Sequence, residues 1–218
     1  MPDIRYTLLA DGTSDRALIP HLTWLLQQHL PNHAIQSEMA ELWRLPKPPK
    51  GLPERIQRAL SLYPCDLLFV HRDAEREQRQ ARLEEINAAL VELSQAEMPP
   101  VLGVVPVRMQ EAWLIFDEVT IRHAANNRYG KIPLQLPPLS SIENRPNPKQ
   151  DLHELLRTAS GLGSRRLHKF SESRAAQRVS ELTDDFSALR IVPAFAALEA
   201  DINRIILEQN WQLLPEPV

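Results

Sequence analysis

The chain has a single cysteine, Cys65, and no long apolar run. One cysteine cannot form an internal disulfide and has no partners for a thiolate zinc cluster, which fits a reducing compartment. The longest apolar runs, Leu67 to Val70 and Val101 to Val107, are far too short to cross a bilayer. No basic region followed by an apolar stretch opens the N-terminus. We therefore expect a cytoplasmic protein that does not bind membranes.

The sequence also lacks the short motifs of several enzyme classes. It contains no G-x-x-x-x-G-K-[ST] phosphate loop and no G-x-G-x-x-G turn, which disfavours a self-contained P-loop ATPase and a dinucleotide enzyme. Its seven histidines show no H-E-x-x-H spacing, which disfavours a zinc hydrolase. Any ATP hydrolysis would therefore have to come from a partner protein.

The 218 residues suffice for one large domain, or for one domain with a modest appendage. Hydrophobic residues make up 43% and charged residues 24%, which excludes wholesale disorder and a fibrous architecture. The net charge of -3 conceals one strongly basic stretch. Its basic side chains are Arg157, Arg165, Arg166, Lys169, Arg174 and Arg178, against the single acid Glu172. Such a stretch either binds a polyanion through phosphate contacts or is simply a solvated helix face.

Strand and helix patterns alternate through the first 125 residues. The expected strands are Ile4 to Ala10, Asp66 to Val70 and Val101 to Val107. The expected helices run from Ser14 through Leu26, from Leu52 to Leu62, from beyond Glu75 to about Ala96, and from near Gln110 to Ala125. Parallel strands need crossover helices between them, so this alternation predicts an α/β fold with a mostly parallel sheet flanked by helices.

The pattern stops from Arg128 to Pro148, where five prolines exclude a regular helix and a central strand. Helices are expected again at about Lys149 to Ser160, Ser173 to Leu182 and Pro193 to Gln209. The predicted organisation is therefore an α/β domain over residues 1–127, a proline-rich loop over 128–148, and a helical C-terminal extension over 149–218 that packs on the same domain.

Acidic residues follow each of the three predicted strands. Asp11 follows the first, Asp73 and Glu75 follow the second, and Glu111 lies about four residues beyond the third. Ligands of an open α/β sheet bind outside the carboxyl ends of its strands. Crowded carboxylates raise one another's pKa unless a cation neutralises them, and oxygen ligands suit Mg²⁺ or Mn²⁺. The joint placement predicts a divalent-metal site.

Each of these residues also has an ordinary structural explanation. Asp11 lies in a turn, where aspartate is common. Asp73, Glu75 and Glu111 could be charges in the first turn of a helix, where acids favour the helix dipole. The same applies to Lys149, a basic residue that follows Pro148 and could simply lie on the surface.

Several segments resemble Toprim domains, which occur in topoisomerases, primases, recombination proteins and the overcoming-lysogenization-defect nucleases. Ala10 to Asp15 resembles the acid-glycine turn after the first Toprim strand, and Asp73-Ala74-Glu75 resembles the Toprim D-x-D motif. Glu111 to Asp117, with Asn147 to Lys149, resembles a group of small standalone Toprim-like bacterial proteins.

The resemblance implies a metal-dependent nuclease that cuts DNA or RNA, within a bacterial anti-phage defence complex that contains an ATPase. It implies that Asp11 is a metal ligand or general base, that Asp73 and Glu75 are the main ligands of Mg²⁺ or Mn²⁺, and that Glu111 binds a second metal. Lys149 would stabilise charge on the phosphate in the transition state. Contacts to the nucleic-acid backbone would come from Arg165, Arg166, Lys169, Arg174 and Arg178.

The chain departs from the Toprim pattern at Asp11, where glutamate is usual, and at Glu75, where a second aspartate is usual. Each change keeps the charge but moves it by about one methylene, which alters metal geometry or marks a member that has lost activity. The alternative hypothesis is a non-catalytic interaction subunit that docks an ATPase or nucleic acid. A primase or topoisomerase fragment is disfavoured, because the chain shows no recognisable zinc module or tyrosine-bearing domain.

Overall fold

A four-stranded, all-parallel sheet organises the chain in the computed structural model, which describes residues 3–93 and 98–212. The strand order is β2-β1-β3-β4, so β1 and β3 are central. The strands are β1 (Asp3–Leu9), β2 (Ala34–Met39), β3 (Leu67–His71) and β4 (Val101–Val104). Parallel strands joined by helices confirm the predicted α/β class.

Helices cover both faces of the sheet. They are α1 (Ile19–His29) and α8 (Pro193–Glu208) on one face, and α2 (Leu52–Leu62) and α3 (Arg79–Leu93) on the other. Tyr6 and Leu8 of β1 pack with the first pair, whereas Leu9 packs with the second. Side chains alternate between the faces of a strand, so a strand that is apolar on both faces needs helices on both sides. None of the helices in the described residues has the length and apolar character needed to span a membrane.

Strand β2 was not among the expected strands. Its sequence, Ala-Ile-Gln-Ser-Glu-Met, has a polar centre, and most of its residues are exposed or half-buried. It lies at an edge of the sheet and pairs in parallel with β1, from Asp3 opposite Ala34 to Leu8 opposite Met39. Backbone hydrogen bonds to β1 therefore define this strand, and they leave little trace in the side-chain pattern.

Short 3-10 helices replace parts of several expected elements. They are η1 (Thr13–Leu18), η2 (Leu42–Arg44), η3 (Gln110–Leu114), η4 (Leu139–Asn144) and η5 (Ser187–Ile191). Of these, η4 lies within the segment that was expected to be a loop throughout. The strand expected over residues 101–107 ends at Val104. The predicted helix end near Ala96 lies outside the described residues.

Asp117 interrupts the helix that was predicted over residues 110–125. Its Oδ1 accepts a hydrogen bond from the backbone N–H of Val119 at 2.9 Å, so it caps α4 (Glu118–Ala124). A capping residue has extended backbone geometry, so a helix cannot continue through it. The prediction of one continuous helix was wrong for this reason.

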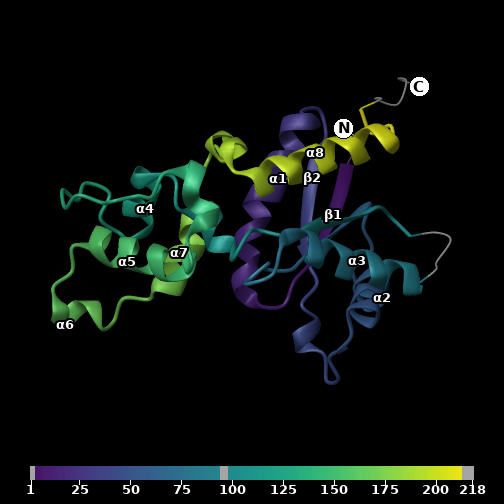
Figure 1. Cartoon of the computed structure of the whole chain (residues 1–218), viewed down its shortest axis with the longest axis horizontal. Coiled ribbons are helices and arrows are strands. Elements are labelled where there is room, and N and C mark those ends of the chain that lie inside the picture. Colours follow the sequence, from purple (N-terminus) through teal and green to yellow (C-terminus); the bar gives the residue numbers. More distant parts are fainter. Residues whose placement is uncertain (1–2, 94–97, 213–218) are drawn as a thin grey trace.

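The remaining helices gather with α4 at the end of the molecule opposite α2 and α3 (Figure 1). They are α5 (Pro148–Ser160), α6 (Ser164–Leu167) and α7 (Glu172–Glu181). Their buried residues belong to the same hydrophobic cluster as β1 and α1. Within that cluster the ring centroids of Trp113 and Phe195 lie 5.2 Å apart. The helical C-terminal part therefore shares its core with the sheet.

His21, on α1, joins two segments that flank the carboxyl ends of the strands. Its Nδ1 lies 3.0 Å from the carbonyl oxygen of Ala17, and its Nε2 lies 3.2 Å from that of Trp113. The ring is 1% exposed and lies 4.2 Å from the ring of Phe186. Burial lowers the pKa of His21 to about 4, against hydrogen bonds to the two carbonyls that raise it. The imidazole is therefore neutral at pH 7, and only one of its two ring nitrogens then carries a proton to donate to a carbonyl.

We expect His21 to make the protein sensitive to acid. Below about pH 6.5 the unfolded chain binds a proton at this residue, whereas the folded chain does not bind one until about pH 4. Stability that is present above pH 6.5 is therefore lost as the pH falls, by about 1.4 kcal/mol per pH unit and about 3 kcal/mol in all. The free energy of unfolding, measured with urea, should depend less steeply on pH for His21→Gln than for wild type between pH 4 and 6.5, by the equivalent of one bound proton. His168→Gln, a control at an exposed position, should keep the wild-type pH dependence. Equal slopes for His21→Gln and wild type would show that this reasoning is wrong.

Candidate functional site

The strand order brings the three acid-bearing segments together at one edge of the sheet. β3 lies between β1 and β4, and all three strands point the same way, so the residues that follow them are neighbours. The backbone N–H of Ala74 donates to the carbonyl of Pro106 at 3.2 Å, and that of Glu75 donates to Arg108 at 2.8 Å. These bonds extend the β3–β4 contact beyond the strands and fix the segment that carries Asp73.

A cavity of about 320 Å³ lies at this edge, and we call it the acid pocket. It is lined by Asp11, Gly12, Ser14, Asp15, His71, Arg72, Asp73, Glu75 and Arg82. Three of the four predicted metal ligands therefore line one pocket. The fourth, Glu111, lines an adjoining cavity, which shares Ser14 with the acid pocket. There the Nζ of Lys149 lies 3.7 Å from the Oε1 of Glu111.

Asp73 is a half-buried carboxylate whose negative charge is poorly compensated. Its Oδ1 accepts a hydrogen bond from the backbone N–H of Gln110 at 3.0 Å and lies 3.5 Å from the Nε2 of His71. Burial raises the pKa of Asp73 to about 6; His71 acts against this, and the charges of Glu111 and Asp15 add to it. A carboxyl group in this state gains free energy from any cation that reaches it.

Asp15 is a residue of this site that was not predicted. Its side chain is buried, and its Oδ2 accepts hydrogen bonds from the backbone N–H groups of Asp11 at 3.1 Å and Gly12 at 3.0 Å. Its Oδ1 accepts from the Oγ of Ser14 at 3.0 Å and the Nε2 of Gln110 at 2.9 Å. Asp15 thus ties the turn after β1 to η3. The signal in the sequence was a second acid in the turn that carries Asp11.

Asp11 is engaged by two arginines. Its side chain is 55% exposed and forms ion pairs with Arg55 of α2 and with Arg72, the latter at 3.3 Å. Arg55 also donates to the carbonyl of Ala10 at 2.7 Å. No sequence signal identified Arg55, because α2 and the turn after β1 meet only in the folded chain.

Glu75 lies at the outer rim of the acid pocket. Its side chain is 67% exposed, and its Oε2 lies 3.8 Å from the Nη2 of Arg82. Its backbone φ is 53°, a left-handed conformation that costs a non-glycine residue about 1 kcal/mol or more. Arg82 in turn donates to the carbonyl of Asp73 at 3.2 Å, so it connects α3 to the pocket.

The donor chemistry of the pocket suits a hard divalent cation, because the candidate ligands are carboxylate oxygens. Among residues 3–93 and 98–212, however, no three Asp, Glu, His or Cys side chains are placed to bind one ion together. Asp11 is held by arginines, and Glu111 faces Lys149. In the part of the chain that the structure describes, Asp73 forms no ion pair with a lysine or arginine. It is therefore the residue best able to receive a cation as the structure stands.

The basic stretch divides into structural and exposed members. Arg157 forms an ion pair with Glu172, and Arg178 donates to the carbonyl of Ala124 at 3.1 Å and to Asn126 Oδ1 at 2.6 Å. Both of these arginines stabilise contacts within the helical part. The members that are exposed to solvent are Arg165, Arg166, Lys169 and Arg174. Of the predicted nucleic-acid contacts, Arg178 is thus committed to the fold.

No family model matches this chain, and comparison with curated proteins and with solved structures finds no match either. The state of Asp73 and its surroundings therefore carries the functional argument.

We expect Asp73 to destabilise the protein at neutral pH. Its pKa is about 6 in the folded chain against an ordinary value of 3.8, so the folded chain holds a proton that the unfolded chain releases at lower pH. The stability that this proton contributes is fully present below pH 3.8 and is lost as the pH rises through 6. Asp73→Asn should therefore raise the free energy of unfolding at pH 7.5, by about 1 to 2 kcal/mol after allowance for solvent screening, and the gain should disappear by pH 4. Chemical unfolding across this range measures it. The control, Asp184→Asn at an exposed position, should change stability by less than about 0.5 kcal/mol.

Proposed function

We propose that this chain is a metal-dependent phosphodiesterase that cuts nucleic acid at the acid pocket. The observation that carries the proposal is Asp73, a poorly compensated carboxylate at the carboxyl ends of three adjacent parallel strands. Perturbed carboxyl groups of this kind concentrate at functional sites, and this edge of an open α/β sheet is where ligands bind. The Toprim resemblance of the segments that carry Asp11, Asp73 and Glu75 supports the same assignment.

In this proposal Asp73 and Glu75 are the main ligands of Mg²⁺ or Mn²⁺ in the acid pocket, and Glu111, in the adjoining cavity, binds a second ion. The bound ion would polarise the phosphodiester and lower the pKa of a bound water. Asp11 serves as a further ligand or as the general base once its arginines bind substrate instead. Lys149, beside Glu111, supplies positive charge where negative charge builds up on the phosphate.

The arginines of the pocket give the proposal a second support. Arg72 and Arg82 line the acid pocket, and Arg55 reaches it through Asp11. A guanidinium group binds phosphate oxygens in a bidentate manner as readily as it binds a carboxylate. A phosphate that enters the pocket can therefore replace Asp11 as the partner of Arg55 and Arg72, which frees the Asp11 carboxylate.

Nucleic acid is the substrate class that the outer surface favours. Arg165, Arg166 and Lys169 are exposed on and just after α6, at the end of the molecule away from α2 and α3. Within the described residues they form no ion pair, so they are available for backbone phosphates. Such contacts give affinity without sequence preference and weaken as salt rises.

A non-catalytic interaction subunit, which docks an ATPase or nucleic acid, is the second candidate function. It is favoured by the ion pairs of Asp11 with Arg55 and Arg72, since a carboxylate so engaged serves structure rather than catalysis.

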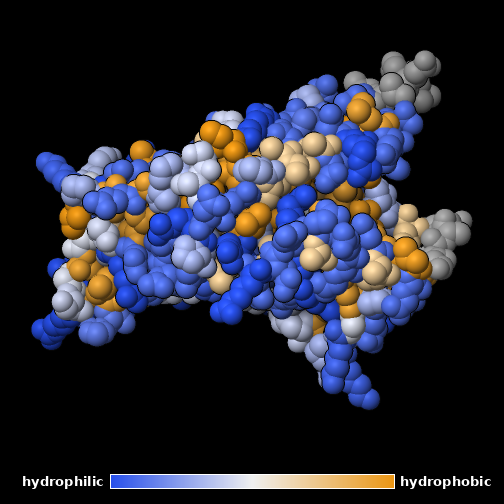
Figure 2. All heavy atoms as spheres, viewed as in Figure 1, coloured by the Kyte–Doolittle hydropathy of each residue, from blue (hydrophilic) through white to orange (hydrophobic). Residues whose placement is uncertain are grey.

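On the face drawn in Figure 2, hydrophobic residues form only small patches among hydrophilic ones, as on ordinary protein surfaces. The ATPase partner and the role in anti-phage defence follow from the Toprim resemblance and are part of the proposal.

Cleavage of plasmid DNA, single-stranded DNA and total RNA tests the proposed activity. Purified wild-type protein should cut at least one of them in Mg²⁺ or Mn²⁺ and none of them in chelator. Asp73→Asn should reduce the rate by roughly 100-fold or more, because a metal ligand is lost. Asp184→Asn should cut like wild type. Absence of cutting by the wild type in every metal would favour the interaction subunit.

Thermal unfolding tests metal binding without reference to activity. An ion present at ten times its dissociation constant should stabilise wild type by about 1.4 kcal/mol, which raises Tm by roughly 3 to 5 °C. Asp73→Asn should show little or no shift with Mg²⁺ or Mn²⁺. If both proteins shift equally, the ion binds elsewhere.

A further inference from the structure

We propose that the cavity beside the acid pocket binds one phosphorylated nucleoside, with its phosphate on Arg174 and Lys149. This cavity measures about 390 Å³ and lies where η1 and η3 meet α5 and α7. The residues that carry the inference are Thr13, Ser14, Gln110, Lys149, Ser173 and Arg174. The inference rests on the proposed function in one respect: we take the bound nucleoside to be the nucleotide of a substrate strand that lies next to the phosphodiester cleaved in the acid pocket.

The size and the walls of the cavity suit a single nucleotide. Ligand cavities range from about 300 to 1,000 Å³, so this one lies at the small end and excludes a duplex. Its walls combine the hydroxyl groups of Thr13, Ser14 and Ser173 with the apolar side chains of Ala17 and Leu114. A nucleoside presents the same combination, with hydroxyl groups on its sugar and an apolar face on its base.

The charges in the cavity favour an anion. Within the described residues the guanidinium of Arg174 forms no ion pair and no hydrogen bond; only its backbone N–H is bonded, to the Oγ of Ser171. Lys149 is paired only loosely, at 3.7 Å from Glu111. Lys149 lies in the first turn of α5 and Arg174 in the first turn of α7, where helix dipoles also favour negative charge. Two cations against one carboxylate leave a positive charge for a phosphate to neutralise.

Gln110 places an unpaired polar group in the wall of this cavity. The residue is 5% exposed and lines the cavity, and its Oε1 has no hydrogen-bond partner within the described residues. A buried, unpaired acceptor of this kind is uncommon in folded proteins. A hydroxyl or amino group of a nucleoside would satisfy it after a small shift of the cavity wall.

Gln110 also connects the cavity with the acid pocket. Its backbone N–H donates to Asp73 Oδ1 at 3.0 Å, and its side-chain amide donates to Asp15 Oδ1 at 2.9 Å. A nucleoside bound against Gln110 would therefore contact the residue whose backbone N–H is hydrogen-bonded to the Asp73 carboxylate. In the view of Figure 1, α6, whose Arg165 and Arg166 are exposed, lies farther from the sheet than α7 does.

Calorimetric binding in chelator, without added metal, tests the inference separately from nuclease activity. The probes are thymidine monophosphate, inorganic phosphate and a single-stranded DNA 12-mer. We expect wild type to bind the nucleotide, the 12-mer or both, and to bind inorganic phosphate at least 10-fold more weakly. Arg174→Gln should weaken nucleotide and 12-mer binding by about 10-fold or more, since it removes a charged phosphate contact.

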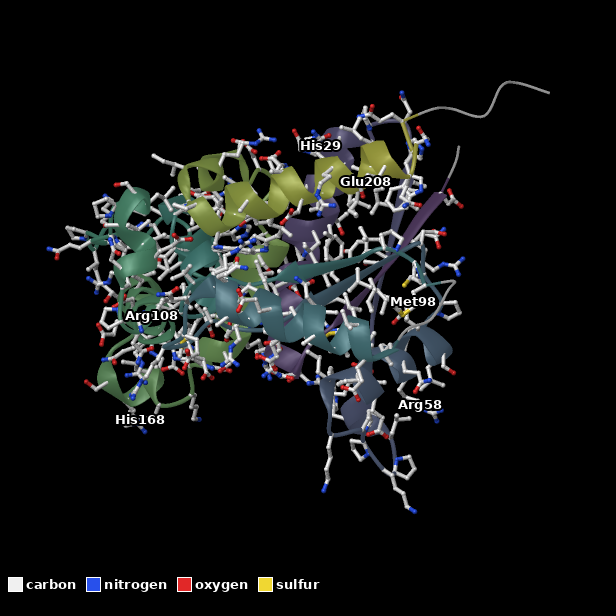
Figure 3. All side chains as sticks on the ribbon, turned by 45° about the vertical axis from the view of Figure 1, so that its right-hand side comes forward. His29, Arg58, Met98, Arg108, His168 and Glu208 are labelled. Atoms are coloured by element: carbon white, nitrogen blue, oxygen red, sulfur yellow. The ribbon has the colours of Figure 1, made fainter. Side chains whose placement is uncertain are left out.

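The matched control is Arg58→Gln, which removes the same charge from an exposed position on α2. Figure 3 shows Arg58 at the opposite end of the view from His168, which follows α6. This variant should bind like wild type. Arg174-dependent binding of the mononucleotide would identify a site that also accepts free nucleotides, and Arg174-dependent binding of the 12-mer alone would identify a strand subsite. Both results support the inference.

Two results would overturn it: binding that Arg174→Gln leaves unchanged, and no binding of either nucleotide probe by wild type. Either could occur in a protein that cuts nucleic acid in Mg²⁺. Conversely, if nucleotide binding depends on Arg174 but the protein cuts no nucleic acid in any metal, the inference about the cavity holds and the proposed nuclease activity is wrong.

Discussion

The parallel pairing of β3 with both β1 and β4 is the constraint on which the site depends. It places the ends of three strands side by side, so acids that are separated by up to a hundred residues become neighbours. Asp15 then holds the turn after β1 to η3 through Gln110, and the buried ring of His21 lies against the backbone of η1 and η3.

The charges of the site are unevenly compensated. Asp73 remains poorly compensated, whereas Asp11 has two arginine partners and Glu75 occupies a left-handed conformation at the rim. Proteins retain such costly features where ligands or reactions need them. The carboxylates can bind a cation and the arginines can bind a phosphate. A metal ion and a phosphodiester bound together would therefore neutralise the negative and the positive charges of the site.

The helical C-terminal part is more than an appendage to this site. Through α5 and α7 it forms one wall of the cavity that contains Glu111 and Lys149, and it shares the hydrophobic cluster that contains Trp113. Movement of α7 would therefore change the cavity and the environment of Glu111 at the same time.

Periodicity in the sequence was enough to predict the α/β class, three of the four strands and the acids at their ends, because apolar alternation and strand-end placement are local properties. It did not show β2, whose backbone pairing leaves a polar pattern, nor the break at Asp117, where a side-chain cap ends one helix and begins another. Asp15, Arg55 and Gln110 became site residues only in the folded chain, because their roles depend on contacts between segments far apart in the sequence. Residue types and their order thus determined which charges reach the edge of the sheet, whereas tertiary packing decided which of them are neutralised and which stay available, since burial and the distance between charges exist only in three dimensions.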